Sequence, residues 1–220
     1  MPSAYYLPIT FQIDKISVKK NKQTASLIIG ITGGIASGKS TLAKFFREKG
    51  YPVLDADLLA HEVYRKGSPG YKDIVAAFGS VVLNHEEEID RKILGSIVFS
   101  DASKRETLNS LVWPRLTTMM RQRIDELRQN HRIIFIEVAL LIEASLTALV
   151  DRVWVVYADR EVAVARLLSR NNLSREDAEK RIDAQTSNEK RLQFADIKIA
   201  NNGSSTEFHQ QLEVLYKGLS

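Results

Sequence analysis

The sequence IIGITGGIASGKST, residues 28–41, decides the fold. It reads as a buried strand, then a glycine-rich turn, then the first turn of a helix. Within it, residues 33–40 match the pattern G-x-x-x-x-G-K-[ST], which is the phosphate-binding loop of nucleoside triphosphatases. The stretch therefore predicts a nucleotide-binding site near the start of the domain.

The residue types in this loop suit a triphosphate. Consecutive backbone N–H groups can wrap a dense anion only where no Cβ blocks close approach, which predicts the roles of Gly33, Gly34 and Gly38. Lys39 would place a positive charge on the β- and γ-phosphates, and Ser40 would offer its hydroxyl to Mg²⁺. The helix that follows would direct its positive end at the phosphates.

A chance match is the alternative, because glycine-rich turns before helices are common. The context disfavours it: the loop follows an apolar run, Leu27 to Ile31, and opens an amphipathic helix over residues 40–49 that ends at Gly50.

Composition sets the broad class. The chain has 220 residues, 44% of them hydrophobic and 26% charged, which is ordinary for a globular protein of one domain. It contains no cysteine, so disulfides and cysteine-based metal sites are excluded. No apolar run approaches the roughly 20 residues of a membrane span, and we expect a cytoplasmic protein. The net charge of +4 is spread among acidic residues, which favours a phosphate-rich small molecule over nucleic acid.

Acidic residues follow two further predicted strands. Asp55 and Asp57 come after the short strand 51–54, and Glu137 ends the apolar strand 132–137. Ligands bind at the carboxyl edge of an open α/β sheet, so these side chains should face the site. One aspartate could instead cap the next helix, while the other, two residues away on extended chain, shares its face. Glu137 resembles the Walker B carboxylate that holds Mg²⁺, with a strand-end cap as the alternative.

Strands alternating with helices predict an α/β fold, a parallel five-stranded sheet flanked by helices. We expect an N-terminal extension over residues 1–26, poorly ordered, with a short strand possible at 10–16. Residues 27–220 would form the domain that carries the phosphate-binding loop, with a core of 27–57 and 131–220. A helical substrate-binding insertion would span 58–130, with one helix beginning at Pro114. A lid carrying arginines would span about 170–192.

From residue 27 to about 203 the chain resembles the dephospho-coenzyme A kinase family. The resemblance rests on TGGIASGKST at 32–41, Asp-Ala-Asp at 55–57, LLIE at 140–143, the helix carrying Arg166 and Arg170, the stretch 185–195 and Asn201-Asn202-Gly203. The phosphate loop alone is shared with many kinases. Its combination with Asp-Ala-Asp and the later Asn-Asn-Gly is much more specific.

The resemblance implies a fold of the nucleoside monophosphate kinase type and ATP-dependent phosphorylation of the ribose 3′-hydroxyl of dephospho-coenzyme A, the last step of coenzyme A synthesis. ATP and Mg²⁺ would be the cofactors, and the protein would be a monomer or a weak homo-oligomer. Another small-molecule kinase with the same fold, acting on a nucleotide or sugar, is the alternative. Carried onto this chain, the resemblance assigns ATP binding to residues 36–41 (Ala36, Ser37, Gly38, Lys39, Ser40 and Thr41), catalysis to Asp57 and, on the lid side, to Arg166 and Arg170, while Asn201 and Asn202 are candidates for reading adenine.

Three residues depart from the family pattern. Ala36 stands where glycine is frequent, and we expect it to be tolerated if its φ is negative. Trp113 replaces a common histidine before Pro114, and Ala139 replaces a frequent proline. The last two leave the details of substrate binding open.

Overall fold

The computed structural model describes residues 26–171 and 173–219. The expectations for residues 1–25, including the strand at 10–16, lie outside this range. The chain divides into two compact units, of which Ala25–Asn202 is the larger and contains the sheet. No helix in the described part is long and apolar enough to cross a membrane.

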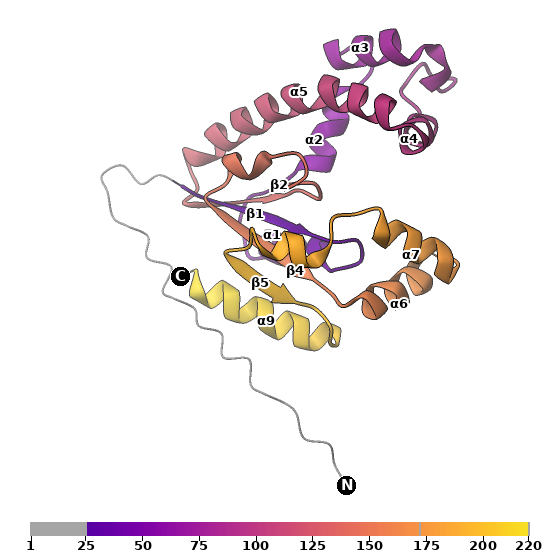
Figure 1. Cartoon of the computed structure of the whole chain (residues 1–220). Coiled ribbons are helices and arrows are strands. Elements are labelled where there is room, and N and C mark those ends of the chain that lie inside the picture. The colour runs from indigo at the N-terminus through magenta and orange to yellow at the C-terminus, as the bar shows by residue number, and fades with distance from the viewer. Residues whose placement is uncertain (1–25, 172, 220) are drawn as a thin grey trace. The chain divides into compact units, whose positions relative to one another are not determined.

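The sheet has five strands, all paired in parallel, in the order β2-β3-β1-β4-β5 (Figure 1). This confirms the predicted fold class. The central strands are buried on both sides, and accordingly their sequences are continuous apolar runs. The strands are β1 (Leu27–Gly33), β2 (Val53–Asp55), β3 (Ile133–Glu137), β4 (Arg152–Tyr157) and β5 (Ile197–Ala200).

The two faces of the sheet bury different sets of side chains, since successive residues of a strand point to opposite faces. Phe135 stacks on Phe46 of α1, with ring centroids 4.4 Å apart, and Trp154 meets both rings edge-on. The alternate residues Ile134 and Ile136 belong to a second cluster with side chains of α2 and α5. Helix α1 and the insertion helices therefore cover opposite faces of the sheet.

The larger unit contains eight α-helices among its described residues. Residues 58–130 are mainly helical, as predicted, and α2, α3 and α4 all contact the long helix α5 (Figure 1). Helices α6 and α7 contact each other as a hairpin. The helices are α1 (Lys39–Glu48), α2 (Ala56–Val63), α3 (Pro69–Phe78), α4 (Arg91–Ser100), α5 (Ala102–Arg128), α6 (Arg160–Asn171), α7 (Arg175–Asp183) and α8 (Asn188–Leu192).

The prediction that a helix begins at Pro114 was wrong, because α5 runs through this proline without a break. An interior proline costs about 3 kcal/mol. Burial of Leu116, Met120 and Ile124 on α5 offsets that cost. Arg115 adds a hydrogen bond from its guanidinium to the carbonyl of Leu111 and an ion pair with Asp73 of α3.

The smaller unit includes Gly203–Ser220. Its helix α9 (Ser205–Gly218) begins with a capping box, in which the Ser204 hydroxyl accepts from the backbone of Glu207 and the Glu207 carboxylate accepts from Ser204 N–H. Phe208, Leu212 and Leu215 are its buried residues.

Candidate active site

The glycines of the phosphate loop are required mainly by packing and backbone geometry. A Cβ on Gly33 would lie 2.2 Å from the carbonyl oxygen of Val156 on β4, a distance no side chain tolerates. Gly38 has φ 101°, in the left-handed region, and caps the N-terminus of α1. The expectation that Gly33 makes room for an anion is therefore incomplete, since this glycine also makes room for a neighbouring strand.

Ala36 adopts φ 58°, so the condition stated for its tolerance, a negative φ, was wrong. The left-handed conformation costs a residue with a Cβ roughly 1–2 kcal/mol. Ala36 packs against the cluster of Val164, Leu167 and Ala178, which holds the loop in place. The loop thus stores strain that a glycine would relieve.

Lys39, Ser40 and Glu137 meet at one oxygen atom. Glu137 Oε1 accepts a hydrogen bond from Ser40 Oγ at 2.7 Å and lies 3.0 Å from Lys39 Nζ. Glu137 is 7% exposed, and its charge is compensated by the lysine. The strand register explains the meeting, because Glu137 lies opposite Ile31, two residues before the loop begins. The carboxylate at the end of β3 and the phosphate loop thus lie together at the carboxyl edge of the sheet, and their joint binding of Mg²⁺ stays a prediction.

Asp55 and Asp57 do not share an extended face, and that prediction was wrong. Asp55 ends β2 beside Glu137 and caps helix α2, its Oδ1 accepting from the N–H groups of Asp57 (2.9 Å) and Leu58 (3.1 Å). Asp57 lies in the first turn of α2. Because the capping residue Asp55 is extended and the helix begins at the next residue, the side chains of Asp55 and Asp57 point in different directions.

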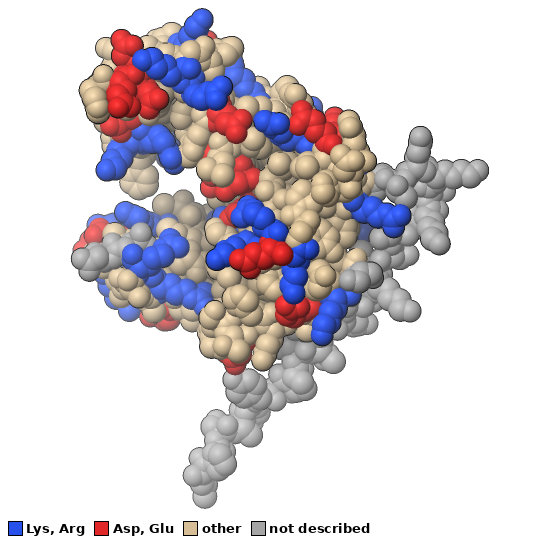
Figure 2. All heavy atoms as spheres, turned by 180° about the vertical axis from the view of Figure 1, so that it is seen from behind, with Lys and Arg blue, Asp and Glu red and all other residues tan. Residues whose placement is uncertain are grey.

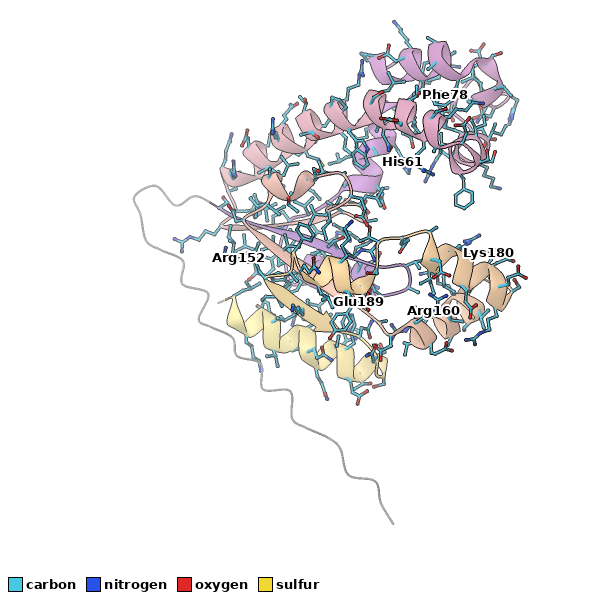
Figure 3. All side chains as sticks on the ribbon, viewed as in Figure 1. His61, Phe78, Arg152, Arg160, Lys180 and Glu189 are labelled. Atoms are coloured by element: carbon cyan, nitrogen blue, oxygen red, sulfur yellow. The ribbon has the colours of Figure 1, made fainter. Side chains whose placement is uncertain are left out.

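Asp57 lies among charged residues of the loop and the strand ends. The protein around this exposed side chain displaces part of its solvation and thereby raises its pKa; the charge of Lys39 opposes that rise, whereas those of Asp55 and Glu137 add to it. His61, one turn further along α2 (Figure 3), has its pKa lowered by partial burial and by Arg91. The carboxylate thus keeps a proton more readily than an ordinary aspartate.

The region around His61 extends the site toward α4. Its ring meets that of Tyr64 edge-on, with centroids 5.8 Å apart. Arg91, the first residue of α4, acts electrostatically on both His61 and Tyr64. Asp57, His61 and Tyr64 are spaced by four and three residues, so they lie along one face of α2.

Arg166 and Asn201 hold the loop from its other side. Arg166 donates to the carbonyl oxygen of Ala36 (3.2 Å) and to Asn201 Oδ1 (3.1 Å). The buried Asn201 donates from Nδ2 to the carbonyl oxygen of Ser37 at 2.7 Å. Asn202 Oδ1 accepts from the N–H of Asp159. Both asparagines thus make hydrogen bonds within the protein, and their predicted contact with adenine stays a prediction.

A cavity of about 260 Å³ lies above the loop. It is lined by residues 33–41 together with Ala139, Arg170 and Gln185. Figure 2 shows the molecule hollowed between the insertion helices and the α6–α7 hairpin, with Lys and Arg side chains on the walls of the hollow. The cavity is therefore lined by the phosphate loop and by two cations, Lys39 and Arg170, a setting that suits an anion.

Two interactions around this cavity were not predicted from the sequence. Gln185 accepts a hydrogen bond from the N–H of Ile35 at 2.8 Å. Arg191, only 2% exposed, pairs with Glu143 at 3.2 Å and lies beside Gly34. Both interactions join residues that are about 50 or more positions apart in the sequence, so no local sequence pattern predicts them.

A family model described as Dephospho-CoA kinase matches residues 27–207. The chain belongs to the dephospho-CoA kinase family. It is 42% identical over 189 residues to a dephospho-CoA kinase of Oceanobacillus iheyensis, covering 86% of this chain and 95% of that protein. Two solved structures are similar to the chain. TT1252 from Thermus thermophilus is 31% identical with a TM-score of 0.76, covering 89% of this chain and 99% of that one. Dephospho-CoA kinase from Campylobacter jejuni is 29% identical with a TM-score of 0.68, covering 88% and 96%. Family membership makes the chain an enzyme, a kinase of the transferase class.

Proposed function

We propose that this chain phosphorylates the ribose 3′-hydroxyl of dephospho-coenzyme A by the residues described above, with ATP as donor. Family membership gives the overall reaction, which converts dephospho-coenzyme A to coenzyme A in the last step of its biosynthesis. The observation that carries the assignment of residues is the convergence of Lys39 and Ser40 on the carboxylate of Glu137, with Asp57 within electrostatic range.

Mg²⁺ fits the donor set at Ser40 and Glu137. The metal prefers oxygen ligands and usually binds one or two carboxylates, phosphate oxygens and water. A hydroxyl and a carboxylate oxygen 2.7 Å apart match that preference. Within the described residues no group of three or more His, Cys, Asp or Glu could hold a metal by itself, so the triphosphate would complete the site. Bound there, Mg²⁺ would neutralise charge on the β- and γ-phosphates.

Lys39 would stay bound to the phosphate oxygens during phosphoryl transfer. Its ammonium has three donors, so it can keep Glu137 and still bind a phosphate oxygen. Phosphoryl transfer needs positioning and charge neutralisation more than covalent chemistry. The N–H groups of the loop and the positive end of α1 would supply the remaining stabilisation of the phosphate charge.

Asp57 would orient the acceptor hydroxyl and take its proton. A carboxylate with a raised pKa is a stronger base than an ordinary aspartate, which suits that role. The side chain of Arg91, on α4, makes no hydrogen bond or ion pair within the described residues and acts electrostatically on His61 of α2. An exposed guanidinium there would attract an anionic acceptor, and the 5′-diphosphate of dephospho-coenzyme A carries the matching charge.

The helical hairpin would act as a lid. Arg160 of α6 pairs with Asp183 of α7 (Nη2–Oδ2 3.0 Å), and Arg175 joins α7 to Glu161, so these two helices can move together (Figure 3). Closure would bring Arg170 onto the transferring phosphate and exclude water. On this proposal the core comprises 27–57 and 131–220, the substrate-binding insertion 58–130 and the lid about 170–192.

The remaining proposals concern the setting of the reaction. We propose a cytoplasmic enzyme with a small-molecule acceptor and no nucleic-acid partner, acting as a monomer or a weak homo-oligomer. The interleaving of acidic and basic residues supports the absence of a nucleic-acid partner.

The test is ADP release by the purified chain with Mg²⁺ and ATP, measured with dephospho-coenzyme A, adenosine, a nucleoside monophosphate and a sugar as separate acceptors. We expect turnover with dephospho-coenzyme A and little with the others. Lys39→Ala should lower turnover by orders of magnitude. Because it also leaves the buried Glu137 without its lysine, the melting temperature should fall as well, while the chain stays folded. Preference for a nucleotide or sugar would refute the acceptor assignment, and an active Lys39→Ala would refute the role of the loop.

A further inference from the structure

The cavity of about 260 Å³ above the loop, called the phosphate cavity below, is lined by the loop and by three residues from elsewhere in the described part of the chain: Ala139, Arg170 and Gln185. Of these three, Gln185 alone has an uncharged polar side chain. It lies in the linker between α7, which ends at Asp183, and α8, which begins at Asn188. Its Oε1 accepts a hydrogen bond of 2.8 Å from the N–H of Ile35, the third residue of the loop. The side chain therefore touches the loop directly, across 150 positions of sequence.

This hydrogen bond fixes the orientation of the carboxamide. A backbone N–H can only donate, so the oxygen of Gln185 must face Ile35 and its NH₂ group must face the other way. That NH₂ group has no hydrogen-bond partner among the described residues, and Gln185 is half-buried at the cavity wall. The two N–H donors of this group are thus available to a ligand in the cavity, which also contains Lys39 and Arg170.

The linker that carries Gln185 is anchored on its C-terminal side. Asn188 donates from Nδ2 to the carbonyl oxygen of Ala158 at 2.8 Å. The buried Arg191 pairs with Glu143 at 3.2 Å. Because these contacts tie α8 to the core, Gln185 is positioned before any ligand arrives, and the closing motion proposed above belongs to the α6–α7 hairpin. Preorganised donors cost no reorganisation when charge develops.

We propose that Gln185 is a phosphate-binding residue, whose carboxamide is oriented by the N–H of Ile35 so that its NH₂ group donates to the transferring phosphoryl group of ATP. The inference rests on the proposed binding of ATP at the loop. Lys39 and Arg170 supply charge to the cavity, whereas Gln185 supplies a directed neutral donor. The hydrogen bond from Gln185 to the phosphoryl oxygen should strengthen as the phosphoryl group separates from ADP. Its loss should therefore lower turnover by about 10- to 100-fold.

Two substitutions separate this role from simple support of the loop. Gln185→Glu keeps the shape and the oxygen that accepts from Ile35, but removes the donor and adds a negative charge. Gln185→Met removes both the acceptor and the donor. Gln193→Glu, an exposed position at the end of α8, makes the same charge change outside the cavity and serves as the matched control.

The experiment measures kcat and the KM for ATP of the full chain with dephospho-coenzyme A and Mg²⁺, together with thermal unfolding. We expect both Gln185 variants to lose at least about 10-fold in kcat with an unchanged melting temperature, and the control to match the parent. Normal kcat in Gln185→Glu, or a loss in only one of the two variants, overturns the proposal. Lys39→Ala is measured in parallel: if it is inactive while both Gln185 variants are normal, only the inference about Gln185 fails, and if it is active, the ATP site itself is misassigned.

Discussion

The ion pair of Arg191 with Glu143 gives a prediction whose size follows from unequal burial. The side chain of Arg191 is 3% exposed, whereas that of Glu143 is 25% exposed, with 3.2 Å between Nη2 and Oε1. Burial lowers the pKa of Arg191, and the nearby carboxylate opposes that shift. Arg191 Nε has no partner among the described residues, so the guanidinium depends heavily on Glu143.

Breaking a buried ion pair from one side costs about 3–5 kcal/mol. Glu143→Leu leaves the guanidinium buried and uncompensated, so we expect a loss near 5 kcal/mol of unfolding free energy. Arg191→Met leaves a carboxylate that water can reach, so we expect a loss near 3 kcal/mol. For a chain of this size each kcal/mol lowers Tm by roughly 2–4 °C, giving about 10–20 °C and 6–12 °C respectively. The double variant should cost less than the sum by about 2–3 kcal/mol.

The assay is guanidinium unfolding of the parent, both single variants and the double variant, with thermal scans as a second probe. The cycle isolates the coupling between the two side chains. Costs that simply add, or a larger loss for Arg191→Met than for Glu143→Leu, would refute the reasoning that the buried guanidinium depends on this carboxylate.

Two further predictions concern the loop and the pH profile. Ala36→Gly relieves about 1–2 kcal/mol of left-handed strain but loses a methyl contact and increases the conformational entropy of the unfolded chain. Its net effect on the free energy of unfolding should therefore lie within about 1 kcal/mol of zero. The control Ala76→Gly, exposed within α3, should cost about 1 kcal/mol, and equal losses at both positions in chemical unfolding would contradict the strain at Ala36. Because the pKa of Asp57 is raised and the role proposed for it as a base needs its charged form, we expect the acidic limb of kcat at higher pH than for an ordinary aspartate. Asp55→Asn still caps α2 but removes one cause of the rise, so the limb should move to lower pH; a limb that stays or moves upward would separate Asp57 from this titration.

The sequence was sufficient to predict the fold because its signals were local. Each central strand is a short apolar run, and the loop carries its own glycine pattern, so strand, loop and α1 followed from adjacent residues. The meeting of Ser40 with Glu137 also followed, since carboxyl ends of parallel strands share one edge.

The errors arose where tertiary contacts or caps override local patterns. Pro114 predicts a helix start, yet packing keeps α5 continuous. Asp57 was placed on extended chain because a capping residue cannot be distinguished from a site residue without coordinates. The positive φ of Ala36 cannot be predicted from the alanine itself, which rarely adopts it; the only signal was the glycine that is frequent at this position in the family.

The departures from the family pattern now have structural settings. Trp113 is partly buried and packs against the core cluster shared by the sheet and the insertion, which is a role in stability. Ala139 lines the phosphate cavity, and its carbonyl oxygen accepts from Thr32 Oγ1 at 3.3 Å. The contact of Gln185 with the loop could not be predicted from a departure from the family pattern or from a local motif, because it depends on the folded position of the α7–α8 linker.

The most direct test of the account is the kcat of Asp57→Asn with dephospho-coenzyme A as acceptor. Asparagine is nearly the same shape as aspartate and keeps a polar contact with the hydroxyl, but it cannot take the proton. A general base contributes about 10²–10⁴-fold, and a loose transition state favours the lower end. The account predicts a fall of at least about 10²-fold in kcat, with ATP affinity and Tm unchanged. Normal turnover in Asp57→Asn would contradict it and would move the catalytic role to another carboxylate of the site.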